Sequence, residues 1–194
     1  MREEDLNRIM EYKNNDPFIR IFDFLRFCLK EEAQEPASLE DMDWDELYAF
    51  GNKQAILGVL FHGIKKLSDS PHRPNKQQIL KWYAACSFIE QANRQAYKDA
   101  SALTTLLQEK YGVHGCVLKG QTNALMYPDP YMRTSGDIDL WTDAKTLDII
   151  RISRQLDPKG EIGYHHIELS YFKTPVEVWR ETESNRRHME LQSI

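Results

Sequence analysis

The sequence has no long apolar run. Its longest apolar stretch, residues 55–61, falls far short of the roughly 20 residues that a bilayer-spanning helix needs. Residues 1–5 are mostly charged, and they lack the apolar core of a secretory signal. We therefore expect a protein with no membrane span that stays in the cytoplasm.

Cysteine is scarce and widely spaced. The three cysteines, Cys28, Cys86 and Cys116, are odd in number and form no C-x-x-C pair. Neither a disulfide framework nor a cysteine zinc site is indicated, so we expect buried thiols. The chain also has no internal repeat and no low-complexity segment.

Basic residues are outnumbered by acidic ones. The chain has 25 lysines and arginines against 30 aspartates and glutamates, a net charge of −5, which argues against a broad basic surface for duplex DNA. Residues 51–100 are locally basic, with 8 basic and 3 acidic side chains, and we interpret them as a solvated helix surface. With 194 residues, 41% of them hydrophobic, the composition is typical of a soluble globular protein of one large domain or two small ones.

The first part of the chain, residues 1–111, is predicted to be a helical N-terminal region. Ser38 with Asp41 indicates one helix start. Residues 76–111 contain no proline or glycine and carry a nearly continuous apolar stripe, so they form one long helix or two in tandem. Gly112 is expected to end this stretch.

Residues 112–194 are predicted to form a second, α/β domain, shortened at its C-terminal end. The pattern changes after residue 112 from helical spacing to short alternating segments. A helix is expected from Thr142 to residue 156, and a hairpin over residues 165–180. The fold class is α+β, a helical region followed by a small mixed sheet flanked by helices. Strands are expected near residues 114–118, 137–141, 165–171 and 175–180, with a short helix over residues 121–127.

Two aspartates lie on one face of an expected strand. Residues i and i+2 of a strand project from the same face, so Asp137 and Asp139 stand side by side while Ile138 and Leu140 point into the core. Two ionised carboxylates about 6 Å apart repel by about 3 kcal/mol at an effective dielectric constant of 20. A divalent cation removes this cost, and Mg²⁺ or Mn²⁺ prefers such oxygen ligands.

The hairpin supplies a third carboxylate. Glu177 stands between two valines and Glu168 between Ile167 and Leu169, so either glutamate projects from the polar face of its strand. If the strand of Glu177 neighbours that of Asp139, the three carboxylates can hold two ions about 3.5–4 Å apart, the arrangement used for in-line phosphoryl or nucleotidyl displacement.

A glycine turn lies upstream of these carboxylates. Gly120 stands between an expected strand and an expected helix, where backbone N–H groups form a seat for phosphate unless the turn is purely structural. Lys119 and Arg133 are cations that can neutralise transferred phosphate oxygens. His165 and His166 are interpreted as structural, because adjacent strand residues point to opposite faces.

Several motifs resemble a known family when taken together: residues 118–120 (Leu-Lys-Gly), Tyr127 with Pro128, Arg133, residues 136–140 (Gly-Asp-Ile-Asp-Leu) and residues 176–180 (Val-Glu-Val-Trp-Arg). The chain resembles the bacterial family of uncharacterised nucleotidyltransferases, which belongs to the polymerase-β-like nucleotidyltransferase superfamily. The likeness covers most of the chain, since residues 43–47 resemble the helical leader of that family.

The resemblance implies a site and a reaction. Asp137 and Asp139 would bind Mg²⁺ or Mn²⁺, and Glu177, preferred over Glu168 on this ground, would complete a catalytic triad. The reaction would transfer a nucleoside monophosphate from a nucleoside triphosphate such as ATP to an acceptor, which can be a small molecule, a protein or RNA. The residues expected to bind the substrate are Lys119, Gly120, Gln121, Arg133, Ser135 and Gly136.

The chain departs from the family pattern at the phosphate turn. Many superfamily members carry Gly-Ser or Gly-Gly there, whereas this chain has Gly120 followed by Gln121. The chain also ends soon after the third carboxylate. These departures indicate an alternative, a catalytically lapsed nucleotide- or protein-binding module such as an antitoxin-like partner. A D-x-D glycosyltransferase is a third hypothesis, and the helical residues 1–110 argue against it.

Overall fold

A computed structural model describes residues 17–32 and 34–179 of the chain. It combines helices with a four-stranded mixed sheet, which confirms the α+β class. The chain divides into two compact units. The helical unit comprises Met1–Glu90 with Met126–Thr134, and the sheet unit comprises Gln91–Leu125 with Ser135–Ile194. The domain division expected after residue 111 stays a prediction.

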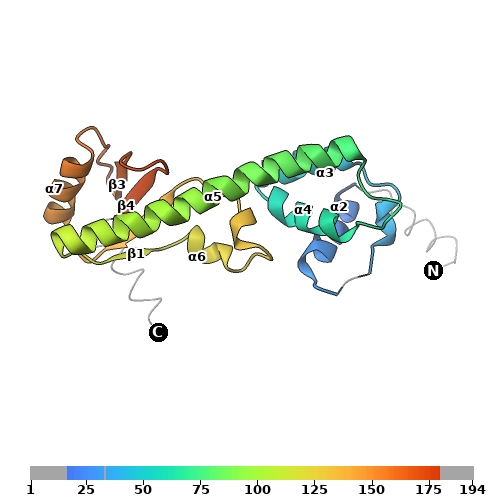
Figure 1. The fold of residues 1–194 in the computed structure, drawn as a ribbon, viewed down its shortest axis with the longest axis horizontal. Helices are drawn as coiled ribbons and strands as arrows, with labels where there is room; N and C mark the ends of the chain where they lie inside the picture. Colours follow the sequence, from blue (N-terminus) through green and yellow to red (C-terminus); the bar gives the residue numbers. More distant parts are fainter. Residues whose placement is uncertain (1–16, 33, 180–194) are drawn as a thin grey trace, which may run out of the picture. The chain divides into compact units, whose positions relative to one another are not determined.

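The helical unit is built around α2 (Pro17–Leu29), α3 (Trp44–Lys53) and α4 (Leu57–Lys66), drawn in blue to green in Figure 1. Its core is apolar and aromatic, and its fully buried side chains include Phe24, Leu47, Leu60, Leu67 and Trp82. Two 3₁₀ turns, η1 (Ala37–Leu39) and η2 (Pro130–Met132), also belong to this unit.

The start of α3 differs from the sequence-based expectation. Asp43 caps this helix, because its carboxylate accepts the backbone N–H groups of Asp45 and Glu46, both at 3.0 Å. Ser38 lies in the short 3₁₀ turn before it. The expected start at Ser38 and Asp41 was therefore wrong: the carboxylate that satisfies the free N–H groups lies two residues later.

A single helix, α5 (Lys76–Tyr111), contributes to both units, so the tandem alternative is wrong. Asn75 and Gln78 form a capping box at its start, each side chain accepting the backbone N–H of the other at 2.9–3.1 Å. Gly112 ends it at a positive φ of 66°, as expected. No helix in the described part of the chain, α5 included, combines the length and apolar character needed to cross a membrane.

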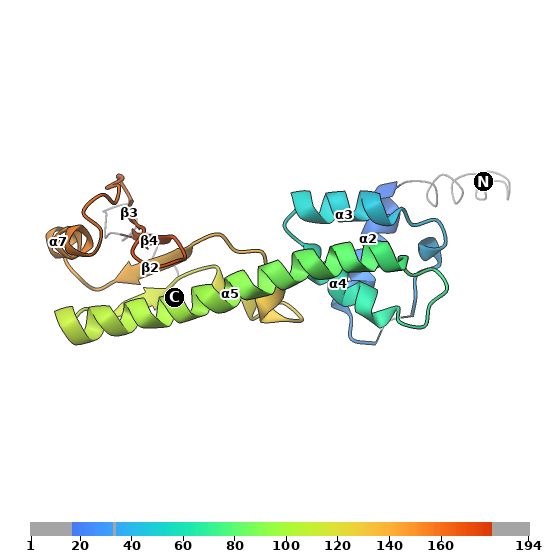
Figure 2. The ribbon, with the colours of Figure 1, turned by 45° about the horizontal axis from the view of Figure 1, so that its top comes forward.

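The strands are β1 (Gly115–Val117), β2 (Ile138–Thr142), β3 (His166–Leu169) and β4 (Val176–Trp179). The sheet has the strand order β1-β2-β4-β3. β2 and β4 run parallel, whereas β1 pairs with β2, and β3 with β4, in antiparallel fashion. The antiparallel β3–β4 pair is the expected hairpin, and Figure 2 shows it next to β2.

The two faces of the sheet differ in chemistry. One face joins the C-terminal half of α5 and the helix α7 (Thr146–Leu156) in a single apolar core. The strand residues of this core are Ile138, Leu140, Ile167, Leu169, Val176 and Val178. The alternation of side chains along the strands therefore projects Asp139 and Glu177 from the opposite face.

Two helix boundaries of the sheet unit also differ from expectation. Thr142 does not cap α7: it is buried, pairs with Gly115 at the end of β2, and leaves Lys145 as the residue before the helix. The short helix α6 (Gln121–Ala124) has four residues and stops before the expected residue 127.

The cysteines match their expectation in two cases of three. Cys28 and Cys86 are buried, and burial raises the pKa of each thiol to about 12, so both stay protonated at neutral pH. Cys116 is exposed, which corrects the expectation that all three are buried. It lies in β1 opposite Trp141, on the polar face of the sheet.

Candidate metal centre

Three carboxylates meet where β2 and β4 run side by side. The parallel register places Asp139 directly beside Glu177, and Asp137 precedes Asp139 by two residues, just before β2 begins. One oxygen from each of these three residues lies within 4.8 Å of the others. Asp139 is buried and the other two are half-buried, so the cluster can hold a metal ion and remains accessible from one side.

Backbone hydrogen bonds hold these strands in place. The N–H of Ile138 donates to the carbonyl of Pro175 at 2.9 Å, and the N–H of Leu118 donates to the carbonyl of Asp139 at 2.9 Å. A side chain adds a further tie, since the buried Asp99 on α5 accepts the N–H of Thr174 at 2.9 Å just before β4. The position of each carboxylate is therefore set by its neighbouring strands.

Two donors share one oxygen of Asp139. The Lys119 Nζ lies 3.1 Å from Asp139 Oδ1, and the indole Nε1–H of Trp179 donates to the same oxygen at 2.9 Å. The Lys119 ammonium also lies 5.2 Å from the centroid of the Trp179 ring, a cation–π distance. A buried carboxylate needs such partners, because an unpaired buried charge is costly.

Two further polar side chains, His166 and Glu168, lie near Glu177. The His166 Nε2 lies 4.0 Å from Glu177 Oε1 and 3.8 Å from Glu168 Oε1. Glu168 pairs with Glu177 across the hairpin, on the side away from β2. Strand order therefore places Glu177, rather than Glu168, in the cluster with the two aspartates.

The backbone of the turn before α6 adopts a conformation that favours glycine. Gly120 has a φ of 80°, a backbone conformation that other residues rarely adopt. Lys119 is exposed, whereas the Gln121 side chain is buried, and its Oε1 and Nε2 have no hydrogen-bond partner among the described residues. Because α6 has four residues, it lacks the length that gives a helix a strong N-terminal dipole.

Three other residues were expected to bind substrate, and they differ in their exposure and contacts: Ser135, Gly136 and Arg133. Ser135 donates its hydroxyl to Asn93 Oδ1 at 2.6 Å. Gly136 is exposed, and a Cβ added there would meet nothing within 4 Å. Arg133 follows the turn η2 and belongs to the helical unit.

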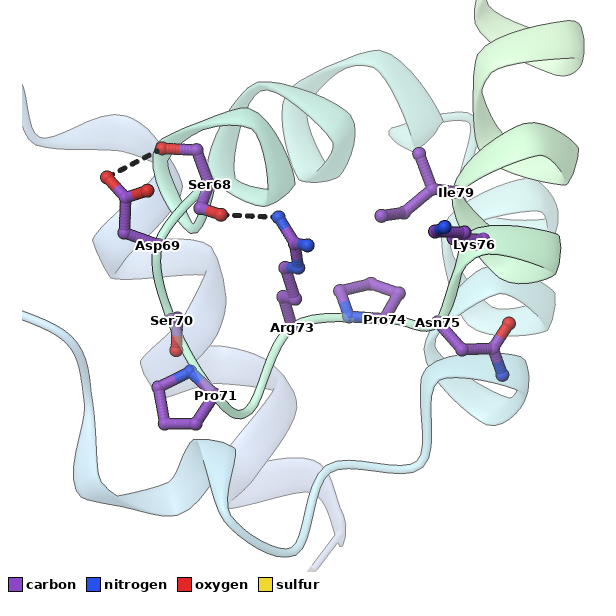
Figure 3. A pocket seen from close by; sticks show the side chains of 9 residues that line it. All are labelled: Ser68, Asp69, Ser70, Pro71, Arg73, Pro74, Asn75, Lys76 and Ile79. Atoms are coloured by element: carbon purple, nitrogen blue, oxygen red, sulfur yellow. Dashed lines mark hydrogen bonds between the residues drawn. The ribbon is translucent and has the colours of Figure 1, made fainter.

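The helical unit has a cavity of its own. It has a volume of about 700 Å³ and lies at the loop before α5, where Arg73 donates to the carbonyl of Ser68 (Figure 3). Asp69 and Lys76 bring opposite charges to its wall. The carboxylate cluster belongs to the sheet unit, so this cavity is no part of the candidate metal centre.

The sequence alone indicates no functional role for Trp179, and it predicts a structural role for His166. A signal for Trp179 is present, because it follows Glu177 by two residues and so shares its face of β4. No local pattern shows that its N–H reaches Asp139, which is 40 positions away in the chain. That contact depends on the pairing of β2 with β4.

One of three comparisons with known proteins gives a match. A family model described as an uncharacterised nucleotidyltransferase matches residues 40–192, more than half of the chain. The matched segment contains all three carboxylates, Lys119 and Gly120. No curated protein and no solved structure matches the chain.

Proposed function

We propose a function from one premise: the chain belongs to the uncharacterised nucleotidyltransferase family. The protein transfers a nucleoside monophosphate from a nucleoside triphosphate to an acceptor. A divalent cation is the cofactor. The observation that carries the proposal is the cluster of Asp137, Asp139 and Glu177, whose oxygens lie within 4.8 Å of one another. Family membership supports nucleotidyl transfer, and the cluster supplies the acidic site that this reaction uses.

The donor chemistry of the cluster fits Mg²⁺ or Mn²⁺. All three ligands are carboxylate oxygens, which these hard cations prefer. Lys119 and Trp179 engage the same oxygen, Oδ1 of Asp139, so its second oxygen stays available as a ligand. When bound, the cation supplies neutralisation of the charge on the phosphate oxygens.

The reaction is an in-line displacement at the α-phosphorus. The acceptor oxygen forms a bond to that phosphorus, the bond to the bridging oxygen of the β-phosphate breaks, and pyrophosphate leaves. Asp137 or Asp139 accepts the proton of the acceptor hydroxyl. Lys119 offsets negative charge on the phosphates beside the Gly120 turn.

The other substrate-binding assignments are part of the same proposal. Gly120 and Gly136 leave room for close approach of the phosphates, and Ser135 and Gln121 lie in the same unit of the chain. Arg133, which lies in the helical unit, stays a sequence-based prediction as a second cation for the triphosphate. Cytoplasmic ATP and the other ribonucleoside triphosphates are the proposed donors.

A thermal-shift titration tests the proposal. ATP, GTP, CTP and UTP are added with and without Mg²⁺ or Mn²⁺ to the wild type and to the double variant Asp137→Asn, Asp139→Asn. A ligand at 100 times its Kd adds about 2.7 kcal/mol of stability, a shift of several degrees. We expect a shift in the wild type that needs both nucleotide and metal, and none in the variant.

The matched control removes two acidic charges elsewhere on the sheet unit. Asp148 and Glu161 are exposed and lie outside the cluster, so the double variant Asp148→Asn, Glu161→Gln should keep the wild-type shift. A folded wild-type protein that shows no metal-dependent shift with any of the four nucleotides contradicts the proposal.

The catalytically lapsed binding module is the second candidate. It is favoured by the turn at Gly120, where the side chain of Gln121 is buried and so is not presented to a phosphate. This candidate predicts nucleotide binding without release of pyrophosphate. A coupled pyrophosphate assay with the stabilising nucleotide and a panel of acceptors (small molecules, proteins and RNA) separates the two: sustained release supports the transferase, and binding without release for every acceptor supports the module. Stabilisation by UDP-sugars alone would instead support a glycosyltransferase.

A further inference from the structure

Lys119 already places a positive charge at the carboxylate cluster. Its Nζ lies 3.1 Å from Asp139 Oδ1 and 5.2 Å from the centroid of the Trp179 ring. Three carboxylates within 4.8 Å of one another repel, so a cation at this position lowers the electrostatic energy of the cluster.

The two partners of this ion pair are very differently exposed. The Asp139 side chain has 5% of its surface exposed, whereas the Lys119 side chain has 58%. Moving the carboxylate would break its hydrogen bond with Trp179 and leave a buried charge unpaired, whereas the Lys119 ammonium can turn into solvent at little cost. Lys119 is therefore the mobile member of the pair.

Trp179 is the fixed donor to the same carboxylate. Its indole belongs to a strand paired on both sides, and Nε1–H donates to Asp139 Oδ1 at 2.9 Å. The ring also lies 5.7 Å from the His166 ring, so it is supported from β3. An indole N–H carries no net charge, so an arriving cation does not repel it as it repels the ammonium.

We propose that Lys119 is an internal counter-ion of the metal centre, which an incoming divalent cation displaces from Asp139, while Trp179 is a positioning residue that keeps Asp139 in place during the exchange. The displaced ammonium stays at the edge of the site and pairs with the phosphates of the nucleotide. This inference rests on the proposed function, because it requires that the cluster binds a divalent cation.

The proposal predicts effects of opposite sign from one substitution. Lys119→Met removes the charge that competes with the metal, so the affinity for Mn²⁺ alone should rise about fivefold. The same variant lacks the cation that would pair with the triphosphate, so the affinity for ATP at saturating Mg²⁺ should fall about fivefold. A purely structural role for Lys119 would weaken both affinities together.

Calorimetric titration measures both affinities, first with Mn²⁺ alone and then with ATP at saturating Mg²⁺. Lys145→Met is the matched control, because Lys145 is exposed in the same unit and forms no side-chain hydrogen bond at the start of α7. It should leave both affinities at the wild-type values. Trp179→Phe keeps an aromatic ring but loses the N–H, and it should weaken Mn²⁺ binding about threefold, with the melting temperature reported beside it.

Tryptophan fluorescence gives a readout that is independent of activity. Mg²⁺ added to the wild type should change the emission as the ammonium leaves the Trp179 ring. The change should persist in Lys145→Met and vanish in Lys119→Met, where no ammonium is displaced.

The outcomes separate this inference from the proposed function. If the wild type binds Mn²⁺ and Lys119→Met binds it no more tightly than Lys145→Met does, the counter-ion role is overturned and the proposed function stands. If the folded wild type binds neither Mn²⁺ nor any nucleotide, both are overturned. Tighter Mn²⁺ binding together with weaker ATP binding in Lys119→Met supports the inference.

Discussion

Asp99 is a buried carboxylate that ties the hairpin to α5. Its Oδ2 accepts the N–H of Thr174 at 2.9 Å, and its Oδ1 accepts Nε2 of Gln95 at 2.8 Å. Asp99→Asn loses the charge that strengthens both bonds, so we expect the free energy of unfolding to fall by about 1–2 kcal/mol. Urea denaturation at pH 7 measures the loss, and an unchanged midpoint would show that the tie adds nothing to stability.

The same carboxylate makes stability depend on pH. Burial raises the pKa of Asp99, but hydrogen bonds from Thr174 and Gln95, with nearby Lys173, outweigh it and hold the pKa below its usual value. The contribution is therefore complete above the unfolded-state pKa of about 3.9, and it is lost as the pH falls through the lower folded-state pKa. The stabilities of wild type and Asp99→Asn should begin to approach each other as the pH falls below about 4, and they should coincide only below the folded-state pKa of Asp99. A gap that stays constant down to pH 2 would exclude this linkage.

The Asp137 carboxylate should destabilise the metal-free protein. Its carboxylate lies within 4.8 Å of two others, and Lys119 pairs with Asp139 rather than with Asp137. Asp137→Asn should raise the free energy of unfolding by about 1 kcal/mol without metal, because one like charge is removed. It should also abolish stabilisation by Mg²⁺. Melting curves with EDTA and with Mg²⁺ check both effects, and destabilisation in EDTA would refute the repulsion argument.

At the scale of elements, α2 and α4 pack closely because α4 carries Gly63. A Cβ at this position would collide with Cys28 Sγ and would lie 3.1 Å from Phe24 Cζ. Gly63→Ala should therefore lower the free energy of unfolding by about 1–2 kcal/mol, even though alanine favours a helix by about 1 kcal/mol. Thermal denaturation measures the loss.

Gly136→Ala is the control for this substitution. A Cβ there meets nothing within 4 Å, so the melting temperature should stay close to that of the wild type. If Gly63→Ala is as stable as Gly136→Ala, the close approach of α2 and α4 does not constrain this position.

Strand pairing, another property of the elements, decided between the two candidate glutamates. The alternation of Val176, Glu177 and Val178 predicts a polar face, and residues 167–169 show the same pattern. Nothing local distinguishes Glu168 from Glu177, because side-chain alternation has no information about which strands become neighbours. The parallel pairing of β2 with β4 brings Glu177 beside Asp139.

At the scale of the whole molecule, each compact unit has its own apolar core. Leu60 belongs to the core of the helical unit and Leu140 to that of the sheet unit, and both are fully buried. Each leucine-to-alanine substitution should cost about 2–5 kcal/mol. Hydrogen exchange should rise in α2, α3 and α4 for Leu60→Ala, and in the strands for Leu140→Ala.

The affinity for Mn²⁺ should distinguish these two substitutions. Leu140 adjoins Asp139 in β2, so Leu140→Ala should weaken Mn²⁺ binding, whereas Leu60→Ala should leave the Mn²⁺ affinity unchanged. A uniform rise in exchange along the chain from either substitution would instead show that the two cores unfold as one.

The sequence by itself determined what local chemistry controls. Helical periodicity and Gly112 predicted helix over residues 76–111 and its end, although not whether it is one helix or two. Alternation predicted the strands around Asp139 and Glu177. Each of these predictions depends on neighbours a few residues apart. The motifs around these residues also indicated the family that the comparison shows. The start of α3 was not predicted, because several nearby residues can cap a helix. The extension of β2 through Thr142 was not predicted either, because the strand partner was unknown.

The tertiary structure decided what depends on contacts between distant residues. It selected Glu177 over Glu168, brought Lys119 and Trp179 to one oxygen of Asp139, and assigned Arg133 to the helical unit. The physical reason is that strand pairing and side-chain packing are non-local. A periodic pattern states which face a residue occupies, and the fold then determines what that residue meets.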